Sequence, residues 1–250
     1  MTRTNTYDDP QFARLYDFII EKLGESEMEV PFWLSVAGAF KGRILEMGCG
    51  TGRLLLQFAT HGYDAAGLDS SGPMLDILAE KLAGLPLSVR AHISYHCGDM
   101  VNPAFATREQ YGLVCFCGSQ FLHLKSDRER LACLMNVRQL LLPGGAVVLS
   151  NSRLEGRPTR KFTVLSTEAP NAPVVEWRRS VSNSRCTVTF KVSDQHENHR
   201  EQRFLWTLYR VDASHMKTLI RRAGLQLLKT PLSIVAPQGK PKDLFFCRVA

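Results

Sequence analysis

The chain has 250 residues, of which 44% are hydrophobic and 22% charged, a composition typical of a folded protein and not of a disordered one. No stretch approaches about 18 uninterrupted apolar residues and no apolar segment opens the chain, so we expect neither a membrane span nor a signal peptide. The net charge of +7 is uneven: residues 151–250 hold 18 Lys and Arg against 8 Asp and Glu. This basic half could bind an anionic substrate or nucleic acid. Alternatively, its charges form a solvated surface without a binding role.

The first 60 residues change from helical to strand periodicity. Apolar side chains at helical spacing predict helices over residues 10–23 and 30–40. A short apolar run over 43–47 then predicts a buried strand. The glycine-rich stretch 48–52 follows, and the helical pattern returns over 54–59. This order predicts a strand, a tight turn and a helix.

The alternation continues to residue 150 and favours an α/β fold. Strands that alternate with helices form βαβ units, which build a mostly parallel sheet with helices on both faces. The predicted strands are 63–69, 93–97, 112–117 and 146–150, and the predicted helices are 73–82 and 128–142, the last ended by Pro143-Gly144-Gly145.

The pattern changes after residue 151, where polar turns separate short β-like segments. We expect an antiparallel insertion that acts as a lid or a dimerisation arm, and then a return to the core. The β-like segments are 174–181, 186–192 and 204–211, followed by a helix over 214–223 and strands over 225–228 and 244–249. The predicted units are therefore 1–151, with the N-terminal helices and a cofactor-binding core, 152–211, the insertion, and 212–250, the end of the core.

The seven cysteines predict reduced thiols and no metal site. They are odd in number, contain no CxxC pair and mostly lie in apolar runs, as expected for a cytoplasmic protein. His196 and His199 lie in a charged turn and are weak candidates for metal ligands.

The glycine turn is the strongest functional signal. A dinucleotide-binding turn would need its third glycine at position 53, which is Arg53, and no Gly-Lys-Ser/Thr of a P-loop follows. Glu46 would repel a pyrophosphate but suits an ammonium group. The turn therefore favours a ligand that carries a cation and no phosphates.

Residues 44–53, Ile-Leu-Glu-Met-Gly-Cys-Gly-Thr-Gly-Arg, resemble the first motif of class I S-adenosylmethionine-dependent methyltransferases. Similar stretches follow in order at Asp69, Ser71-Gly-Pro-Met74, Asp99, 140–146 and 214–225, so that the resemblance covers roughly 42–151 and 212–249. It implies a Rossmann-like, seven-stranded and mostly parallel sheet, interrupted by the antiparallel β lid. It also implies S-adenosylmethionine as cofactor and S-adenosylhomocysteine as product.

The resemblance assigns roles to residues at the ends of the first strands. Asp69 would hold both ribose hydroxyls, Met74 would pack near the adenine, and Asp99 would accept from the adenine amino group. Asp69 could instead cap the next helix, and Asp99 could be a turn residue. Cys49 could occupy its position in the turn without a functional role. The expected cofactor-binding residues are Glu46, Gly48, Cys49, Gly50, Asp69, Ser70, Met74, Asp99, Met100 and Cys117.

The catalytic candidates are His123 and Tyr16. The fourth strand ends without the Asn/Asp/Ser-Pro-Pro-Tyr of DNA- and protein-amide methyltransferases and without the acid of metal-dependent catechol-type enzymes. His123 resembles the histidine of small-molecule and deoxysugar N-methyltransferases, and Tyr16 resembles the tyrosine of their first helix. As a base, an imidazole would titrate near its usual pKa of about 6.5, but His123 could equally be a capping or surface residue.

These observations favour transfer of a methyl group to N or O of a small-molecule acceptor, which the insertion would cover. A nucleic-acid or protein methyltransferase using the basic half stays open, although no RNA-binding module is recognisable, and so does a regulator that binds the cofactor without chemistry. We expect a monomer or homodimer without membrane association. The acceptor could carry an anionic group. The aromatic residues of the insertion, which would line an apolar cavity or form the core of its sheet, are Phe162, Trp177, Phe190, Phe204, Trp206 and Tyr209.

Overall fold

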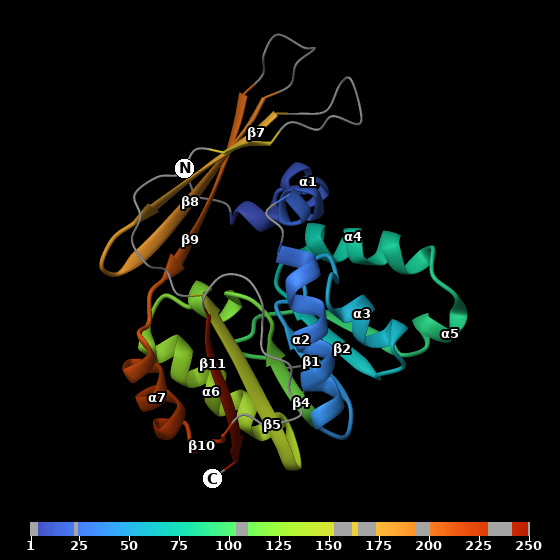
Figure 1. Cartoon of the computed structure of the whole chain (residues 1–250), viewed down its shortest axis with the longest axis vertical. Coiled ribbons are helices and arrows are strands. Elements are labelled where there is room, and N and C mark those ends of the chain that lie inside the picture. Colours follow the sequence, from blue (N-terminus) through green and yellow to red (C-terminus); the bar gives the residue numbers. More distant parts are fainter. Residues whose placement is uncertain are drawn as a thin grey trace.

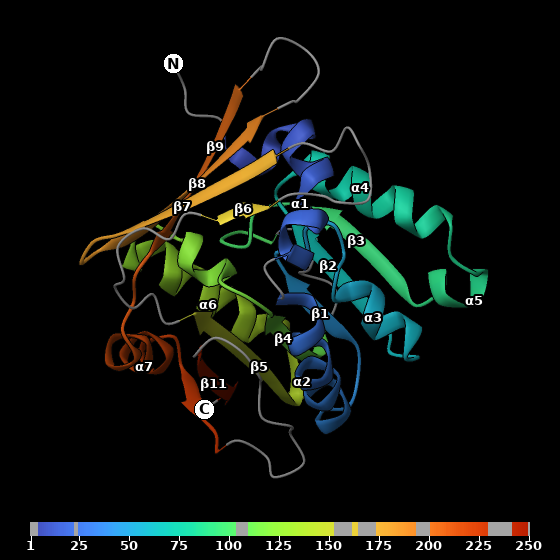
Figure 2. The same cartoon turned by 45° about the horizontal axis from the view of Figure 1, so that its top comes forward.

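The computed structural model contains two sheets, one large and mostly parallel and one small and antiparallel (Figures 1 and 2). It describes residues 5–22, 25–103, 110–152, 162–164, 174–193, 201–229 and 242–249. Within these residues, no helix has both the length and the hydropathy needed to cross a membrane.

The large sheet has seven strands in the order β10-β11-β5-β4-β1-β2-β3. Strands β1 to β5 run parallel to one another, whereas β11 runs antiparallel to both β5 and β10. The predicted Rossmann-like, mostly parallel sheet is thus confirmed. Its strands are β1 (Ile44–Met47), β2 (Ala65–Asp69), β3 (Ile93–Cys97), β4 (Tyr111–Phe116), β5 (Leu141–Ser152), β10 (Leu225–Leu227) and β11 (Lys242–Val249).

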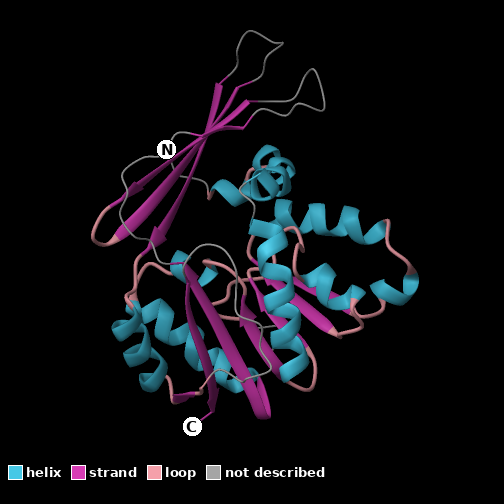
Figure 3. Cartoon of the chain, viewed as in Figure 1, coloured by secondary structure: helices cyan, strands magenta, loops and turns pink. Residues whose placement is uncertain are grey.

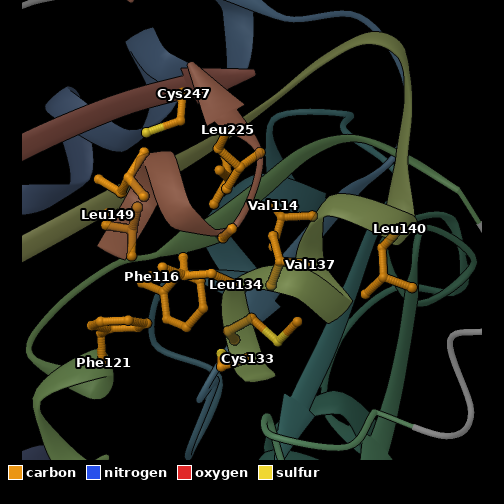
Figure 4. Close-up of a cluster of buried hydrophobic side chains, with 14 of the residues drawn as sticks. Val114, Phe116, Phe121, Cys133, Leu134, Val137, Leu140, Leu149, Leu225 and Cys247 are labelled. Atoms are coloured by element: carbon orange, nitrogen blue, oxygen red, sulfur yellow. The ribbon is translucent and has the colours of Figure 1, made fainter. Parts of the chain in front are cut away.

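Helices cover both faces of this sheet because the central strands are apolar on both sides. Ile44 faces a cluster built from α2, α3 and α4, whereas the next residue, Leu45, faces a cluster built from α6 and α7. Figure 4 shows part of the second cluster, in which Leu134 and Val137 of α6 pack beside Val114 and Phe116 of β4. The helices are α1 (Pro10–Lys22), α2 (Glu25–Ala39), α3 (Leu55–Thr60), α4 (Gly72–Ala83), α5 (Leu87–Arg90), α6 (Asp127–Leu140) and α7 (Ala213–Arg222), with 3-10 turns η1 (Thr6–Asp8) and η3 (Gln120–His123).

The small sheet lies beside α1 (Figure 3) and also reaches α6, whose Arg130 donates to the carbonyl of Tyr209. Alternate residues of its central strand are buried and pack against Phe12 and Ile19 of α1. The predicted antiparallel insertion therefore has a core of its own, shared with the N-terminal helix. Its strands are β6 (Phe162–Val164), β7 (Val174–Val181), β8 (Arg185–Ser193) and β9 (Glu201–Tyr209), paired in that order.

Some element boundaries differ from those expected. Helix α6 ends at Leu140 and β5 begins at the next residue, so Pro143-Gly144-Gly145 interrupts a strand and does not end a helix. Gly144 has a φ of 80°, and the pairing of β4 with β5 shifts in register between Tyr111 and Leu113. The short helix α5 was not predicted, because four residues carry no periodicity.

Candidate active site

The glycine turn leaves β1 in a conformation that few other residues adopt. Gly48 and Gly50 have φ values of 73° and 55°, in the left-handed region. The amides of Gly48 and Cys49 both donate to the carbonyl of Leu68 in β2, over 2.7 and 3.0 Å. A Cβ on Gly48 would lie only 2.5 Å from Cγ of Gln120. Any side chain there would therefore displace Gln120 as well as strain the backbone.

Asp69 ends β2 and holds the turn from the other side. One carboxylate oxygen accepts from the amide of Gly50 (2.8 Å) and the other from the amide of Ser71 (2.9 Å). Burial raises the pKa of Asp69 above its usual value, and these hydrogen bonds oppose that shift. The cap of α4 is Ser71, whose hydroxyl accepts from the amide of Met74. Helix capping is thus performed by Ser71, which leaves Asp69 facing the turn.

Glu46 is a buried carboxyl two residues before the turn. It is 3% exposed, and its Oε2 has no hydrogen-bond partner in the part of the chain that the structure describes. Burial raises the pKa of Glu46 to about 8, although Arg53 nearby favours the charged form. Arg53 in turn pairs with Glu29 of α2 over 2.6 Å. A positively charged ligand group beside Glu46 would stabilise its carboxylate.

Most of the expected site residues surround one cavity of about 790 Å³ at the carboxyl ends of the parallel strands. Three expected residues do not line it: Glu46, Cys49 and Cys117. The side chains of both cysteines are buried in the cluster with α2 and α3, and burial raises their pKa values well above the usual range. The expected residues that do line it are Tyr16, Gly48, Gly50, Asp69, Ser70, Met74, Asp99, Met100 and His123.

His123 ends η3 and lines the cavity. Its ring meets that of Tyr7 edge to face, with centroids 5.4 Å apart. Burial lowers the pKa of His123 to about 4, because the charged imidazolium would lose hydration. The expectation of a pKa near 6.5 is therefore wrong. At neutral pH the imidazole is therefore uncharged, and the lowered pKa makes it a weaker base than a solvated imidazole.

The small sheet supplies the opposite wall. Phe190, Trp206 and Tyr209 line the cavity as expected, whereas Phe204 packs against Phe12 of α1, with ring centroids 5.2 Å apart. The other two expected aromatic residues are Phe162 and Trp177, whose side chains are not among those that the structure describes.

Tyr7 and Gln120 are site residues that the sequence did not reveal. The ring of Tyr7 stacks on Trp206 (5.6 Å between centroids) and meets Tyr16 edge to face. Gln120 donates from Nε2 to the carbonyl of Gly48 (3.3 Å) and accepts from the amide of Gly118. The only signal for Gln120 is that it is polar and closely follows a buried strand.

A second polar cluster ties α1 to the glycine turn. Asp17 of α1 accepts from the hydroxyl of Thr51 (2.6 Å) and pairs with Lys81 of α4 (2.5 Å), which also donates to the carbonyl of Thr51. These contacts hold α1, and with it Tyr16, above the turn.

Across the described ranges, no group of three or more His, Cys, Asp or Glu side chains gathers as a metal site. His196 and His199, the candidate ligands of the insertion, lie outside the described residues.

Comparisons with known proteins agree with this geometry. Residues 44–145 match a family model described as "Methyltransferase domain". Magnesium-protoporphyrin O-methyltransferase of Rhodobacter capsulatus is 37% identical over 62 residues, which cover 25% of this chain and 26% of that protein. The chain matches the first three curated relatives over only 26% to 57% of their length.

Solved structures match over nearly the whole chain. The CcbJ methyltransferase of Streptomyces caelestis has a TM-score of 0.77 at 22% identity, with 98% of each chain covered. CalS10 of Micromonospora echinaspora, an amino pentose methyltransferase solved with S-adenosylmethionine, has a TM-score of 0.65 at 19% identity over 92% of this chain and 95% of that one. At these identities the likeness concerns the fold. The family match over residues 44–145 shows a methyltransferase domain, and the surrounding fold is shared with solved S-adenosylmethionine-dependent methyltransferases.

Proposed function

We propose that this protein transfers a methyl group from S-adenosylmethionine to a nitrogen or oxygen atom of a small-molecule acceptor. The observation that carries the proposal is the single cavity, which extends from the glycine turn past His123 to the small sheet. Cofactor and acceptor would therefore meet in one space with protein on both sides. A cavity of about 790 Å³ is in the range of pockets that enclose small molecules.

The cofactor end fits the chemistry of S-adenosylmethionine. The free lone pairs of Asp69 would accept from the ribose hydroxyls, and Asp99 would accept from the adenine amino group, with Met74 and Met100 against the adenine. The unpartnered Oε2 of Glu46 fits the cofactor's ammonium group. When bound, the cofactor supplies a methyl group on a positively charged sulfur, which departs as a neutral thioether after in-line attack.

The acceptor end contributes alignment, exclusion of water and a proton acceptor. The neutral imidazole of His123 would take the proton of an attacking amine or hydroxyl. Tyr16 and Tyr7 would position the acceptor, since both rings line the cavity beside His123. Alignment of the attacking atom supplies much of the rate enhancement in reactions of this type.

In this proposal the chain consists of the core segments 1–151 and 212–250 and the insertion 152–211, which acts as a lid. Nine residues of β7, β8 and β9 line the cavity, which supports a lid more directly than a dimerisation arm. Similar proteins include one named as an O-methyltransferase and one named as an amino pentose methyltransferase, so both oxygen and nitrogen acceptors belong in the first screen. The basic C-terminal half favours acceptors with an anionic group.

The proposal is tested by supplying S-adenosylmethionine and fractionated metabolites and measuring S-adenosylhomocysteine. We expect release that depends on one fraction and that is reduced in the His123→Ala or Asp69→Ala variant. Calorimetry with S-adenosylhomocysteine alone should show saturable binding to the wild type. A protein that fails to bind it, or that binds NAD tightly, would contradict the proposal.

A further inference from the structure

The part of the small sheet that lines the cavity carries one charged residue. Of its described cavity-lining residues, Cys186, Val188, Phe190, Leu205, Trp206, Thr207, Leu208 and Tyr209 are uncharged, and Arg179 of β7 is the exception. A charged side chain on an otherwise uncharged wall has a desolvation cost, which a ligand of opposite charge would offset.

Arg179 lies in one row with Val188 and Trp206. Arg179 is paired with Val188 across β7 and β8, and Val188 is paired with Trp206 across β8 and β9. Residues directly opposite in antiparallel strands project to the same face, and neighbouring strands are about 4.8 Å apart. The guanidinium and the indole therefore flank Val188 on the cavity side, within reach of one small group above it.

Neither polar group of this row is satisfied by the described protein. Arg179 is partly buried and makes no hydrogen bond or ion pair with any residue that the structure describes. Over the same residues, the indole N–H of Trp206 is buried and has no acceptor. Its ring is held in place by stacking on Tyr7. An unpaired guanidinium on the cavity wall, two strands away from an indole N–H without an acceptor, is suited to an anion.

Among the described cations that line the cavity, Arg179 is the one that is partly buried and has no ion pair with a described residue. Arg53 is paired with Glu29, and Lys125 is exposed, with its amide donating to Glu129. The lining carboxylates come from the large-sheet part of the chain, on α2, α6 and the ends of β2 and β3. They are Glu29, Asp69, Asp99 and Glu129.

We propose that Arg179 and Trp206 form an anion-binding subsite for the acceptor, in which the guanidinium and the indole N–H bind the oxygens of a carboxylate or phosphate group above Val188. This deepens the proposed function and rests on it. A planar guanidinium matches either group with two parallel hydrogen bonds, which would fix the orientation of the acceptor as well as its affinity.

The subsite is tested by binding, without turnover, of probes that differ in charge. Benzoate, phenyl phosphate and neutral benzamide are titrated against the protein saturated with S-adenosylhomocysteine, at about 0.15 M ionic strength to screen non-specific attraction. We expect benzoate or phenyl phosphate to bind about tenfold or more tightly than benzamide. The preferred anion then distinguishes a carboxylate from a phosphate acceptor.

Arg179→Gln should abolish that preference, and Trp206→Phe should reduce it while keeping the ring. The control is Arg178→Gln, which removes the same charge from the neighbouring, exposed position on the other face of β7. Equal binding of the three probes to the wild type, no saturable binding of either anion, or an equal loss in the control would overturn the subsite. Binding of S-adenosylhomocysteine to the wild type is measured separately, so failure of the proposed function stays distinguishable.

Discussion

Asp69 belongs to the fold and to the site at once. The amides of Gly50 and Ser71 donate to different oxygens of its carboxylate, which as a whole can accept further hydrogen bonds. The same carboxylate thus fixes the glycine turn and the start of α4 and remains able to accept from a ligand. Its burial makes each of these hydrogen bonds more consequential, since an unpaired buried acceptor is costly.

Replacement of Asp69 should therefore weaken the cofactor site. We expect Asp69→Ala to reduce the affinity for S-adenosylmethionine by roughly 1–3 kcal/mol, the scale of hydrogen bonds to a charged group, as measured by calorimetry. Asp64→Ala, at the exposed far end of β2, is the matched control and should leave affinity unchanged. Unchanged affinity in Asp69→Ala would reject the ribose-binding role.

For His123 we expect both a rate effect and a shifted pH profile. His123→Ala should lower kcat about 10²–10⁴-fold, the usual range for general bases, and Tyr16→Phe should cost less. Because burial lowers the pKa of His123 to about 4, its free base persists on acidification from pH 8 to pH 6. Protonation of His123 should therefore not lower the kcat of the wild type between pH 8 and pH 6.

An acceptor amine that arrives unprotonated needs no base. An unaffected kcat in His123→Ala would then reject the base role, while the methyltransferase assignment would stand.

Glu46 should make the stability of the cofactor-free protein depend on pH. Its pKa is raised from 4.5 to about 8, so between these values the unfolded chain has released a proton that the folded protein retains. The resulting contribution to the free energy of unfolding is fully present below about pH 4.5 and is lost as the pH rises to about 8. We expect Glu46→Gln to remove that decline in urea midpoints measured at pH 5.5 and 8.

The same Glu46→Gln substitution should weaken binding of S-adenosylmethionine, because the amide cannot offer a charge to its ammonium group. A variant that binds the cofactor as tightly as wild type would contradict the proposed contact.

At the scale of elements, the sequence predicted what depends on local patterns. Strands β2 and β3 end at Asp69 and Cys97 as expected, because short runs between polar turns define them, although only β2 is buried. Contacts between distant segments were not predictable, such as Tyr7 with Trp206 or Gln120 with Gly48. Periodicity identifies the buried face of an element, but it does not identify the partner against which that face packs.

The packing of α1 against the small sheet is one such contact, and it can be measured. Phe12 is 0% exposed and touches Phe190 and Phe204 of the sheet. Phe12→Ala should lower the free energy of unfolding by about 3–5 kcal/mol, because it leaves a cavity between helix and sheet. Leu87→Ala, at a position 74% exposed on α5, is the control, expected within about 0.5 kcal/mol of wild type in urea unfolding. A comparably small effect of Phe12→Ala would mean that the two elements are not coupled.

At the scale of the whole molecule, the described basic residues of the C-terminal half are spread over several elements. Arg178, Arg185 and Arg203 are exposed on the small sheet, and Lys217 and Arg221 are exposed on α7. Arg203 is already paired with Glu201. Proteins that bind single-stranded nucleic acid interleave such cations with exposed aromatic rings on which bases stack. Within the described residues, the large exposed hydrophobic side chains include one aromatic, Tyr95, which lies on β3.

This distribution predicts weak binding of random RNA. Scattered surface cations give an attraction that salt screens, and the net charge of +7 is modest. In fluorescence anisotropy with a labelled random RNA, we expect little binding at about 0.15 M salt and some binding at about 0.02 M. Arg178→Gln should then weaken only the low-salt binding. Tight binding at 0.15 M with a steep, log-linear dependence on salt would indicate several specific phosphate contacts, and would favour a nucleic-acid methyltransferase over one for small molecules.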